Sequence, residues 1–529
     1  MRSKRMLLGA ATVLLVAVCL VMPAAAKEEG TAQFCAAELP LGSPSLHETR
    51  TTEQVAPGVT YTKIVRGEQS KKDFYTVDVA FEADRQAAEA VARELTADGY
   101  RARIETISQR VPDDPQKGPL GYLVRTGSFT TQARADGLRE ELTARGYTGL
   151  RTVYTGEDGG KTSGPWVVHV LEVDPDLYDG TITPDLATRI VPDRETLTSI
   201  SDRTDSLAGI NGGYFVIGDN DGTPGDLAGI SVIDGVPVSE AVDGRTSLIL
   251  PPGSGEGADI AALSDTIITT AFDGATREID GLNREPGLIR GCGGDGGDQP
   301  TEFPKHDFTC TDESELILFT STFGNNTEPG PGVEAVLDSS GRVTELRDMR
   351  GGTIPENGSV LSGTGEAADW LRAHAQPGQE IDVSTKITAD GAPTSLAPGT
   401  GVVNGGPRLL SNGEPDITAF REGFVWPEDP EFYYRFGVRR NPRTLAGVTP
   451  EGKLLLVAVD GRQPGYSVGT SFEESARVMR ALCAEEALNL DGGGSTTMTI
   501  GEELVTHPSD PTGERPVGDA IVLLPQLNP

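Results

Sequence analysis

The sequence is poor in cysteine, histidine, aromatic residues and positive charge. Its 529 residues include five cysteines and five histidines, and aromatic residues make up 5%. Cysteine and histidine show no zinc-like spacing, so we predict no resident metal. Lysine and arginine number 45 against 79 acidic residues, which gives a net charge of −34. This negative field repels phosphate backbones and anionic lipid, which argues against binding to nucleic acid or to a membrane surface.

Glycine and proline are abundant, with 66 and 36 residues. They favour many turns and short strands and exclude a bundle of long helices. Apolar residues make up 37% of the chain, which is enough for a folded core, and the length suggests two or three domains. We therefore predict an α+β fold.

The first 26 residues have the composition of a secretory signal peptide. Three basic residues precede the apolar stretch Leu7–Val21, and Ala24–Ala26 offers a small-residue cleavage site. The apolar stretch is too short for a comfortable membrane-spanning helix, and no later segment reaches the required length. We expect a secreted or cell-wall-associated protein with no membrane span after cleavage.

Four cysteines follow the predicted cleavage site, namely Cys35, Cys292, Cys310 and Cys483. An even number in an exported protein favours two disulfides. Cys292 and Cys310 close a loop rich in glycine and proline, and we predict that they pair. Cys35 and Cys483 then form the second predicted pair by elimination.

Residues 72–155 contain an internal repeat. Tyr75–Val77 matches Tyr122–Val124, and Glu94–Tyr100 matches Glu141–Tyr147. Each half starts with alternating apolar residues typical of a strand, continues into a helix stopped by glycine, and ends in a short strand. We predict a small βαββαβ unit with both helices on one face of its sheet.

The segment Tyr122–Phe129 and the helix that follows it through Leu142 resemble the SPOR domain family. The resemblance implies that this SPOR-like unit binds peptidoglycan glycan strands stripped of their peptides. A structural duplicate without a ligand is the alternative, because small βαβ repeats serve many functions.

Three segments of the C-terminal part share one pattern, in which an apolar run ends in asparagine and glycines follow closely. They are Asn211-Gly212-Gly213, Asn404-Gly405-Gly406 and Asn489-Leu490-Asp491-Gly492-Gly493-Gly494-Ser495. Glycines after a strand let consecutive backbone N–H groups turn outward to bind an anion. The neighbouring asparagine or aspartate can hold a sugar hydroxyl or a reacting water.

A predicted hairpin over residues 445–459 adds two arginines. It would bring Arg443 and Arg462 to one end of the sheet, and two guanidinium groups in so acidic a chain suggest an anion site. The next helix starts with the capping box Ser471–Glu474 and is predicted to run to about Ala487.

Together these motifs resemble the phosphodiester glycosidase family, whose best-known member acts on N-acetylglucosamine-1-phosphodiesters. The residues that carry the likeness are Asn211–Phe215, Asn404–Gly406, Pro442–Thr444, Asp460–Arg462 and Asn489–Ser495, with Val55–Tyr61 similar to the opening strand and Arg515–Ala520 to the closing strand. Many bacterial members place histidine before Pro-Arg-Thr, where this chain has Asn441. A catalytic histidine is therefore excluded at that position.

The resemblance also implies a domain arrangement. A large hydrolase domain with a mixed or antiparallel sheet would occupy residues 165–529, and its first strand would lie in the N-terminal segment 27–71. The SPOR-like unit, residues 72–155, would be inserted after that strand.

The implied reaction is hydrolysis of a sugar C1–O bond whose leaving group is a phosphomonoester, in a cell-envelope or extracellular polymer. We expect Asp491, or secondly Asp460, to supply the carboxylate beside the anomeric carbon. The phosphate would bind to Arg443 and Arg462, assisted by the N–H groups of the Gly212 and Gly405 turns. The remaining predicted substrate-binding residues are Asn211, Gly213, Asn404, Gly406, Thr444, Asn489, Gly492, Gly493 and Ser495.

Three alternatives stay open at this point. The protein could bind cell-wall glycans without cleaving them. Gly465–Gly469 has the spelling of a nucleophile elbow, which would make Ser467 the nucleophile of a serine hydrolase. Asp219, Asp221 and Asp226 have a spacing suited to calcium, although an Asx-rich turn explains the same residues.

Overall fold

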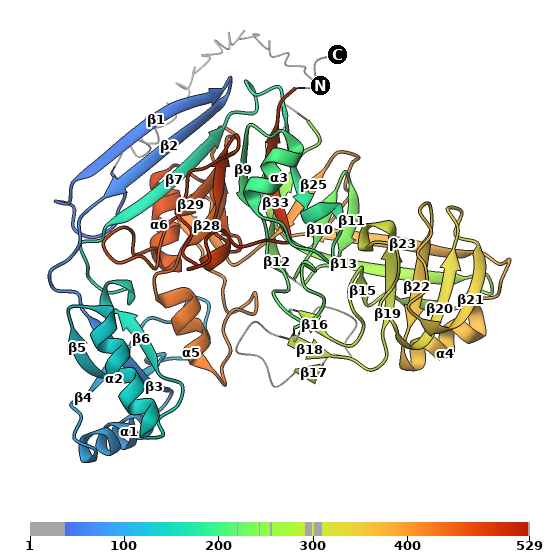
Figure 1. The fold of residues 1–529 in the computed structure, drawn as a ribbon. Coiled ribbons are helices and arrows are strands. Elements are labelled where there is room, and N and C mark those ends of the chain that lie inside the picture. The colour runs from blue at the N-terminus through green and yellow to red at the C-terminus, as the bar shows by residue number, and fades with distance from the viewer. Residues whose placement is uncertain are drawn as a thin grey trace, which may run out of the picture.

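The computed structural model describes residues 38–219, 221–242, 244–253, 257–290, 299–300 and 309–526 (Figure 1). The predicted signal peptide, Cys35 and Cys292 lie outside the described residues. The chain is organised around antiparallel sheets with a few short helices, which confirms the predicted α+β class.

The central sheet has eight strands, and its inner strands are buried on both faces, whereas the edge strands are largely exposed. In spatial order its strands are β1 (Glu48–Ala56), β2 (Val59–Arg66), β7 (Trp166–Val173), β29 (Leu454–Val459), β28 (Arg443–Val448), β30 (Glu486–Asn489), β26 (Arg408–Ser411) and β27 (Glu414–Pro415). Side chains alternate along β29, so Leu456 and Ala458 enter the core on one face, while Leu455 and Val457 enter the core on the other. The predicted hairpin is confirmed, with Arg443 opposite Val459.

Two further sheets pack on one face of the central sheet. The five-stranded sheet contains β32 (Glu503–Leu504), β31 (Met498–Ile500), β9 (Ala208–Asn211), β33 (Asp519–Leu524) and β8 (Thr181–Leu186). The second contains β11 (Val236–Ser239), β10 (Ser231–Ile233), β25 (Gly401–Asn404), β12 (Arg245–Leu250), β13 (Asp259–Ala271), β14 (Thr276–Glu278), β23 (Ile381–Ala389) and β24 (Ala392–Thr394). Both share one apolar core with the central sheet, to which Ile210, Leu248 and Leu488 belong.

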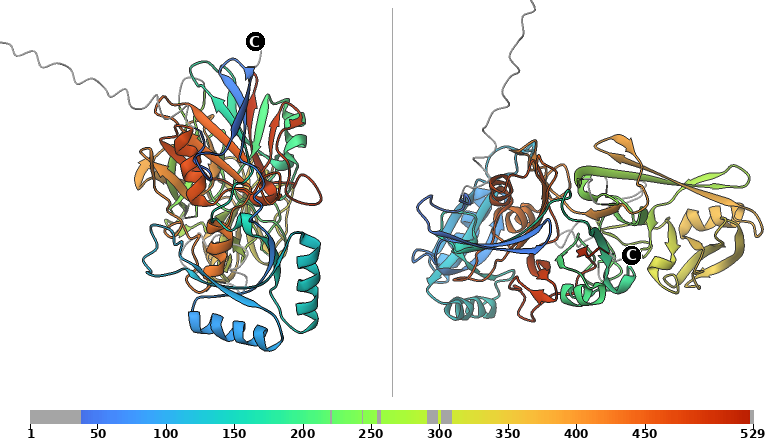
Figure 2. Two further views of the ribbon diagram at one scale, coloured as in Figure 1. Left: turned by 90° about the vertical axis from the view of Figure 1, so that its left-hand side faces the viewer. Right: turned by 90° about the horizontal axis from the view of Figure 1, so that it is seen from above.

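The SPOR-like unit forms a separate four-stranded sheet with its two helices on one face (Figures 1 and 2). Its elements are β3 (Tyr75–Glu82), α1 (Arg85–Ala97), β4 (Ala102–Ile107), β5 (Gly121–Phe129), α2 (Gln132–Ala144) and β6 (Arg151–Tyr154), and the strand order is β4-β5-β3-β6. The unit interrupts the chain between β2 and β7, which are paired neighbours in the central sheet. The two connections meet where the Glu68 N–H donates to the Ser163 carbonyl at 2.9 Å.

The helix-free face of the SPOR-like sheet is covered by the rest of the protein. Leu123 belongs to the same apolar core as Tyr434, and the rings of Phe81 and Tyr434 stack with their centroids 5.3 Å apart. Arg125 is buried and donates to Asp158 and Tyr434. The unit is therefore packed against its neighbour through apolar and ionic contacts.

A third lobe was not predicted from the sequence. It consists of β15 (Gly281–Leu282), β19 (Leu316–Thr320), β20 (Gly330–Leu337), β21 (Val343–Arg350), β22 (Ser359–Gly363) and α4 (Gly365–His374). Figure 1 places it at the opposite end of the molecule from the SPOR-like unit. It has its own core, to which Leu316, Leu361 and Leu371 belong.

The remaining elements are α3 (Leu197–Thr204), β16 (Ile289–Arg290), β17 (Gln299–Pro300), β18 (Thr309–Thr311), α5 (Pro430–Tyr433), a π-helix (Tyr434–Val438) and α6 (Phe472–Ala481). The capping box of α6 is confirmed, but the helix is shorter than predicted. The chain leaves it through Cys483, which has a φ of +69° and so cannot continue a right-handed helix.

Cys310 and Cys483 are disulfide-bonded. Their predicted partners lie outside the described residues, so the pairing stays a prediction. Within the described ranges, helices long and apolar enough to cross a membrane are absent.

Candidate functional site

The three glycine turns meet at the ends of β9, β25 and β30. A Cβ atom added to Gly213 would lie 2.5 Å from the Asn404 backbone oxygen, and one on Gly405 would lie 2.8 Å from the Asn489 backbone oxygen. These glycines are thus required because the turns contact each other directly. The prediction that distant segments converge is consistent with this geometry.

The N–H groups of two turns are not directed outward. Gly212 N–H donates to the Asp519 carbonyl at 3.0 Å, Gly213 N–H to Asp519 Oδ1 at 2.9 Å, and Gly406 N–H to the Asn489 carbonyl at 2.8 Å. Gly405 is buried. The predicted anion binding by the Gly212 and Gly405 turns is therefore wrong, because these turns face the protein interior and most of their donors are already used there.

The three asparagines are also buried and hold the turns together. Asn211 Nδ2 donates to the Asp491 carbonyl at 2.8 Å, and Asn211 Oδ1 accepts from Thr444 Oγ1 at 2.7 Å. Asn404 Oδ1 accepts from the Tyr214 N–H at 2.8 Å, and Asn489 Nδ2 donates to Tyr214 Oη at 2.7 Å. Asn211, Asn404, Asn489 and Thr444 thus support the site's framework instead of orienting substrate hydroxyls as predicted.

The third turn is the one that reaches the surface. Asp491, Gly492 and Gly493 are partly exposed, whereas Ser495 is buried. Asp491 Oδ1 accepts the Gly492 N–H at 2.9 Å, and the Gly493 N–H donates to the Pro442 carbonyl at 2.9 Å. Asp491 therefore remains the candidate carboxylate.

Arg462 lies beside this turn. Its Nη1 and Nη2 atoms are 3.3 Å from the position that a Cβ on Gly493 would occupy, so a side chain there would crowd the guanidinium. Asn441 Oδ1 accepts from Arg462 Nε at 3.2 Å and from Nη2 at 2.9 Å. Arg462 is exposed, and its pKa is lowered, chiefly by desolvation. We call the group formed by Asp491, Gly492, Gly493 and Arg462 the catalytic corner.

Arg443 does not face the solvent. It is 1% exposed, its Cζ lies 4.3 Å from the centre of the Phe472 ring, and its Nε donates to the Thr470 carbonyl at 3.1 Å. Burial lowers its pKa to about 10. Its predicted contact with phosphate is therefore wrong, because a guanidinium sealed under an aromatic ring cannot reach a ligand at the surface.

Asp460 is likewise buried, with 1% of its surface exposed. Its carboxylate lies 3.1 Å from His169 Nε2 and accepts from Tyr466 Oη at 3.0 Å and from the His507 N–H at 3.0 Å. His169 Nδ1 is in turn 2.7 Å from Tyr61 Oη. This network fixes the strand end that leads to Arg462, so Asp460 is not the second substrate carboxylate that we predicted.

Sequence reasoning gave no role to His169, which belongs to no motif, or to the Tyr61 side chain, which lies in the segment similar to the opening strand. Only their positions in the central sheet indicate a role. Tyr61 lies on β2 and His169 on β7, and these paired strands lie next to β29 in the central sheet. Asp460 directly follows β29.

Asp519 is an acidic residue near the corner whose role the sequence did not indicate. It is fully buried beneath the Gly212–Gly213 turn, and its Oδ2 atom has no hydrogen-bond partner among the described residues. Its pKa is raised to about 7, chiefly by burial and to a smaller extent by the negative charge of Asp491. Asp491 and Asp519 thus flank one turn as an exposed and a buried acid.

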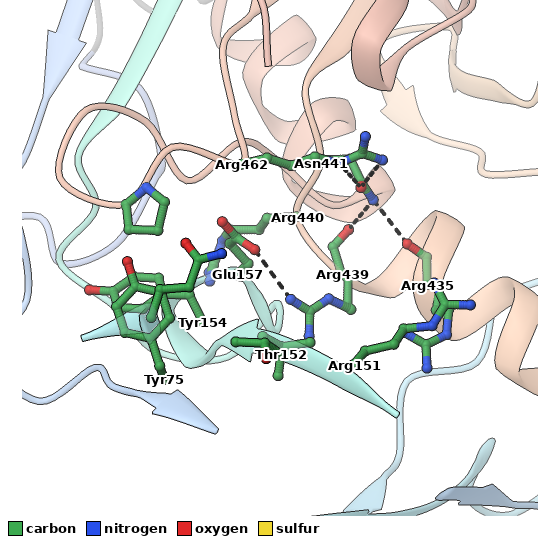
Figure 3. Close-up of a pocket in the computed structure, with 13 residues that line it drawn as sticks. Tyr75, Arg151, Thr152, Tyr154, Glu157, Arg435, Arg439, Arg440, Asn441 and Arg462 are labelled. Atoms are coloured by element: carbon green, nitrogen blue, oxygen red, sulfur yellow. Dashed lines mark hydrogen bonds and ion pairs between the residues drawn. The ribbon is translucent and has the colours of Figure 1, made fainter. Parts of the chain in front are cut away.

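A pocket of about 440 Å³ adjoins the catalytic corner and separates it from the SPOR-like unit (Figure 3). Arg462 and Asn441 line one side of it, and Arg151 and Thr152 of β6 line the other. Arg435, Arg439, Arg440 and Glu157 complete its charged lining. In a chain with a net charge of −34, five arginines around one pocket indicate a site for an anion.

The structure does not support two of the alternatives, the serine hydrolase and the calcium site. Ser467 is buried, and its hydroxyl donates to the Asp460 carbonyl at 2.5 Å, so it is not an accessible nucleophile. In the described part of the chain, histidine, cysteine, aspartate and glutamate form no group of three that could hold a metal. The described residues therefore give no support to the calcium alternative at Asp219, Asp221 and Asp226.

A partly exposed aspartate, two residues from a glycine that lies beside an arginine and next to a basic pocket, is an arrangement suited to hydrolases of anionic glycans. The phosphodiester glycosidase family model matches residues 332–524, and the SPOR domain model matches residues 71–151. The chain therefore contains a phosphodiester glycosidase domain and a SPOR domain.

Three known proteins are similar to the chain. A solved structure from Burkholderia pseudomallei K96243, described as a candidate exported protein, is 36% identical, with a TM-score of 0.84 over 93% of this chain and 99% of that one. N-acetylglucosamine-1-phosphodiester alpha-N-acetylglucosaminidase of Mus musculus is 38% identical over 68 residues, which is 13% of each protein. A hypothetical protein from Synechocystis shares the fold at 17% identity, with a TM-score of 0.52 over 90% of this chain and 79% of that one.

Proposed function

We propose that the protein is an exported hydrolase that cleaves the glycosidic bond of a sugar-1-phosphodiester. The observation that carries the proposal is the catalytic corner, where Asp491 is accessible within two residues of a glycine that contacts Arg462. The family match and the short similarity to the mouse glucosaminidase support N-acetylglucosamine-1-phosphodiesters as the substrate class.

The leaving group explains why few catalytic residues suffice. A phosphomonoester leaves as a stable anion, because its second pKa is about 6, so it needs less protonation than a sugar alkoxide. The main requirements are a cation at the departing phosphate and a carboxylate at C1. In the proposed mechanism Arg462 holds the phosphate, and Asp491 acts on C1 either directly or through a water.

A product assay tests this role. The full mature chain is incubated with the methyl phosphodiester of N-acetylglucosamine 1-phosphate, and free reducing sugar and methyl phosphate are measured. We expect Asp491→Asn to lower kcat by a factor of about 100 or more, in the range for loss of a catalytic acid or base. Asp179→Asn, at an exposed position, serves as the matched control and should behave as the wild type.

Two results of this assay would contradict the proposal. Release of sugar by a folded Asp491→Asn protein at the wild-type rate would remove Asp491 from the reaction. If the wild type releases no sugar from this compound or from matched compounds with other sugars, the protein is better explained as a glycan-binding protein. Asn441 is the observation that favours this second candidate, because many relatives have histidine at that position.

We further propose that the SPOR-like unit directs the enzyme to peptidoglycan in the cell wall. The SPOR domain match and the similarity to a candidate exported protein support this localisation. Co-sedimentation with purified sacculi, intact or with the peptides removed enzymatically, tests it. Stronger binding to the stripped sacculi is the expected result, and equal absence of binding to both would contradict the targeting role.

A further inference from the structure

The basic pocket is built by two parts of the chain that are far apart in sequence. Strand β6 of the SPOR-like unit supplies Arg151 and Thr152, while the π-helix and the segment after it supply Arg435 and Arg439. In Figure 3 the side chains of Arg151 and Arg435 approach each other at one end of the pocket. Neither part could form the pocket alone.

Three of the pocket's arginines have acidic partners that hold them in place, and the first of them, Arg435, pairs with Glu431. Arg439 pairs with Glu157 and with Asp158, at 3.3 and 2.7 Å. Arg440 pairs with Glu474 at 2.7 Å. These pairs fix the pocket wall and partly neutralise it.

Arg151, in contrast, is not held by an acidic partner in the described structure. Its side chain forms no hydrogen bond or ion pair with any described residue, and it is exposed at the edge strand of its sheet. Its pKa is lowered first by desolvation and then by the positive charge of Arg435, and the more weakly acting charges of Glu431 and Asp78 do not reverse this. Arg435 is paired with Glu431, whereas Arg151 beside it has no ion pair of its own in the described structure, and a bound anion would supply one.

The pocket is also connected to the catalytic corner through a shared residue. Arg462 lines the pocket and at the same time contacts the Gly493 turn. The volume of about 440 Å³ lies within the range of small-molecule sites. A ligand unit in the pocket would therefore be adjacent to a group held at Asp491.

We propose that this pocket is a second anion subsite, which binds a phosphate of the substrate that neighbours the phosphate being cleaved. The substrate class is then a glycan with repeated phosphodiester links, held jointly by the SPOR-like unit and the hydrolase domain. The identity of this polymer rests on the proposed function, whereas anion binding in the pocket does not depend on turnover. The SPOR-like unit has a direct part in substrate binding under this proposal.

Binding of inorganic tripolyphosphate to the full mature chain, measured by titration calorimetry, tests the subsite. We expect Arg151→Ala to weaken binding at least tenfold. Arg93→Ala removes a positive charge from the exposed face of α1, outside the pocket, and should bind as the wild type does. Because the Arg151 side chain has no ion pair to lose within the described structure, its variant should also unfold at the wild-type temperature or above.

The variants separate the two proposals. Asp491→Asn should keep tripolyphosphate binding while losing turnover. Binding that is unchanged in Arg151→Ala, or that depends on Arg462 alone, would overturn the second subsite. If tripolyphosphate binds through Arg151 but no sugar phosphodiester is cleaved, the subsite stands and the proposed reaction fails.

Discussion

Arg462 is positioned by one amide side chain. Asn441 Oδ1 accepts two hydrogen bonds from it, and Asn441 Nδ2 donates to the Arg435 carbonyl at 2.9 Å. Asn441 itself is buried, so its geometry is fixed by the protein. An exposed guanidinium would otherwise sample many rotamers, and this amide keeps it beside the Gly493 turn.

Asn441→Ala should therefore weaken substrate binding more than it slows the chemistry. We expect KM for a sugar-1-phosphodiester to rise about tenfold, roughly 1.4 kcal/mol, which is within the range for a hydrogen bond to a charged group. The value of kcat should stay within about twofold, because Asn441 touches Arg462 and not the reacting atoms. Steady-state kinetics at fixed pH measure both, with exposed Asn357→Ala as the control. A fall in kcat at unchanged KM would argue against this positioning role.

Asp519 makes the stability of the protein depend on pH. Its pKa is about 7 in the folded protein, against 3.8 for an ordinary aspartate. Between these values the folded state keeps a proton that the unfolded state has lost. The free energy of unfolding should thus fall as the pH rises from about 4 to about 7, by up to roughly 4 kcal/mol.

Asp519→Asn removes this titration. The stability of the variant relative to the wild type should increase between pH 5 and pH 8, as measured by urea unfolding at both values. Asp179→Asn, which is exposed, should leave the wild-type pH dependence unchanged. If the difference between Asp519→Asn and the wild type is the same at both pH values, Asp519 does not have the raised pKa.

At the scale of elements, strand β5 connects the SPOR-like unit to the hydrolase domain. Arg125 on this strand lies 2.7 Å from Asp78 within its own sheet and 2.6 Å from Asp158 beyond it. Arg125 is 1% exposed, and it is the only ion-pair partner of the buried Asp78 among the described residues, whereas Asp158 also pairs with Arg439.

Arg125→Met should lower the free energy of unfolding by about 3–5 kcal/mol, because it leaves the buried Asp78 carboxylate unpaired. The loss should be accompanied by a separate early transition of the SPOR-like unit in thermal unfolding. Arg139→Met on α2, whose ion pair with Asp136 is partly exposed, should change stability by less than about 1 kcal/mol. A single transition at the wild-type temperature in Arg125→Met would contradict the connecting role.

The elements with strong local signals were predictable. The repeat of the SPOR-like unit, the hairpin at 443–459 and the capping box of α6 all depend on nearby residues and are present. The end of α6 was missed, because residues after Ala481 have good helix propensity but must turn to begin β30. The third lobe was missed as well, because its strands carry no motif.

At the scale of the whole molecule, the SPOR-like unit covers an apolar surface of the hydrolase domain. Tyr434 stacks on Phe81, and the N–H groups of Phe420 and Arg421 donate to Asp113 at 3.0 and 2.9 Å. The unit is thus packed against the hydrolase domain and is not a module attached only through a flexible linker.

Replacing residues 69–162 with a short Gly-Ser linker tests this dependence. The connection is geometrically possible, because Glu68 and Ser163 are hydrogen-bonded neighbours. We expect the shortened protein to bind a hydrophobic dye and to aggregate at concentrations at which the wild type is monodisperse, since its apolar face is uncovered. Dye fluorescence and light scattering measure this, and a soluble variant with wild-type dye binding would contradict the account.

The site could be predicted in outline but not in its details. Motifs placed Asn211, Asn404 and Asp491 in one region, and the structure brings them together. The spacing of motifs in a sequence, however, does not show which side chains are buried. Arg443 and Asp460 are buried, so they support the site structurally instead of contacting the substrate. The arginine pocket depends on two distant parts of the chain, so no local pattern indicated Arg151.

The location of the substrate phosphate tests the central claim most directly. A crystal of Asp491→Asn soaked with the methyl phosphodiester of N-acetylglucosamine 1-phosphate would show it. We predict the phosphate within hydrogen-bonding distance of Arg462 and the sugar C1 facing residue 491. A phosphodiester bound elsewhere, with Arg462 contacting only Asn441, would contradict the account.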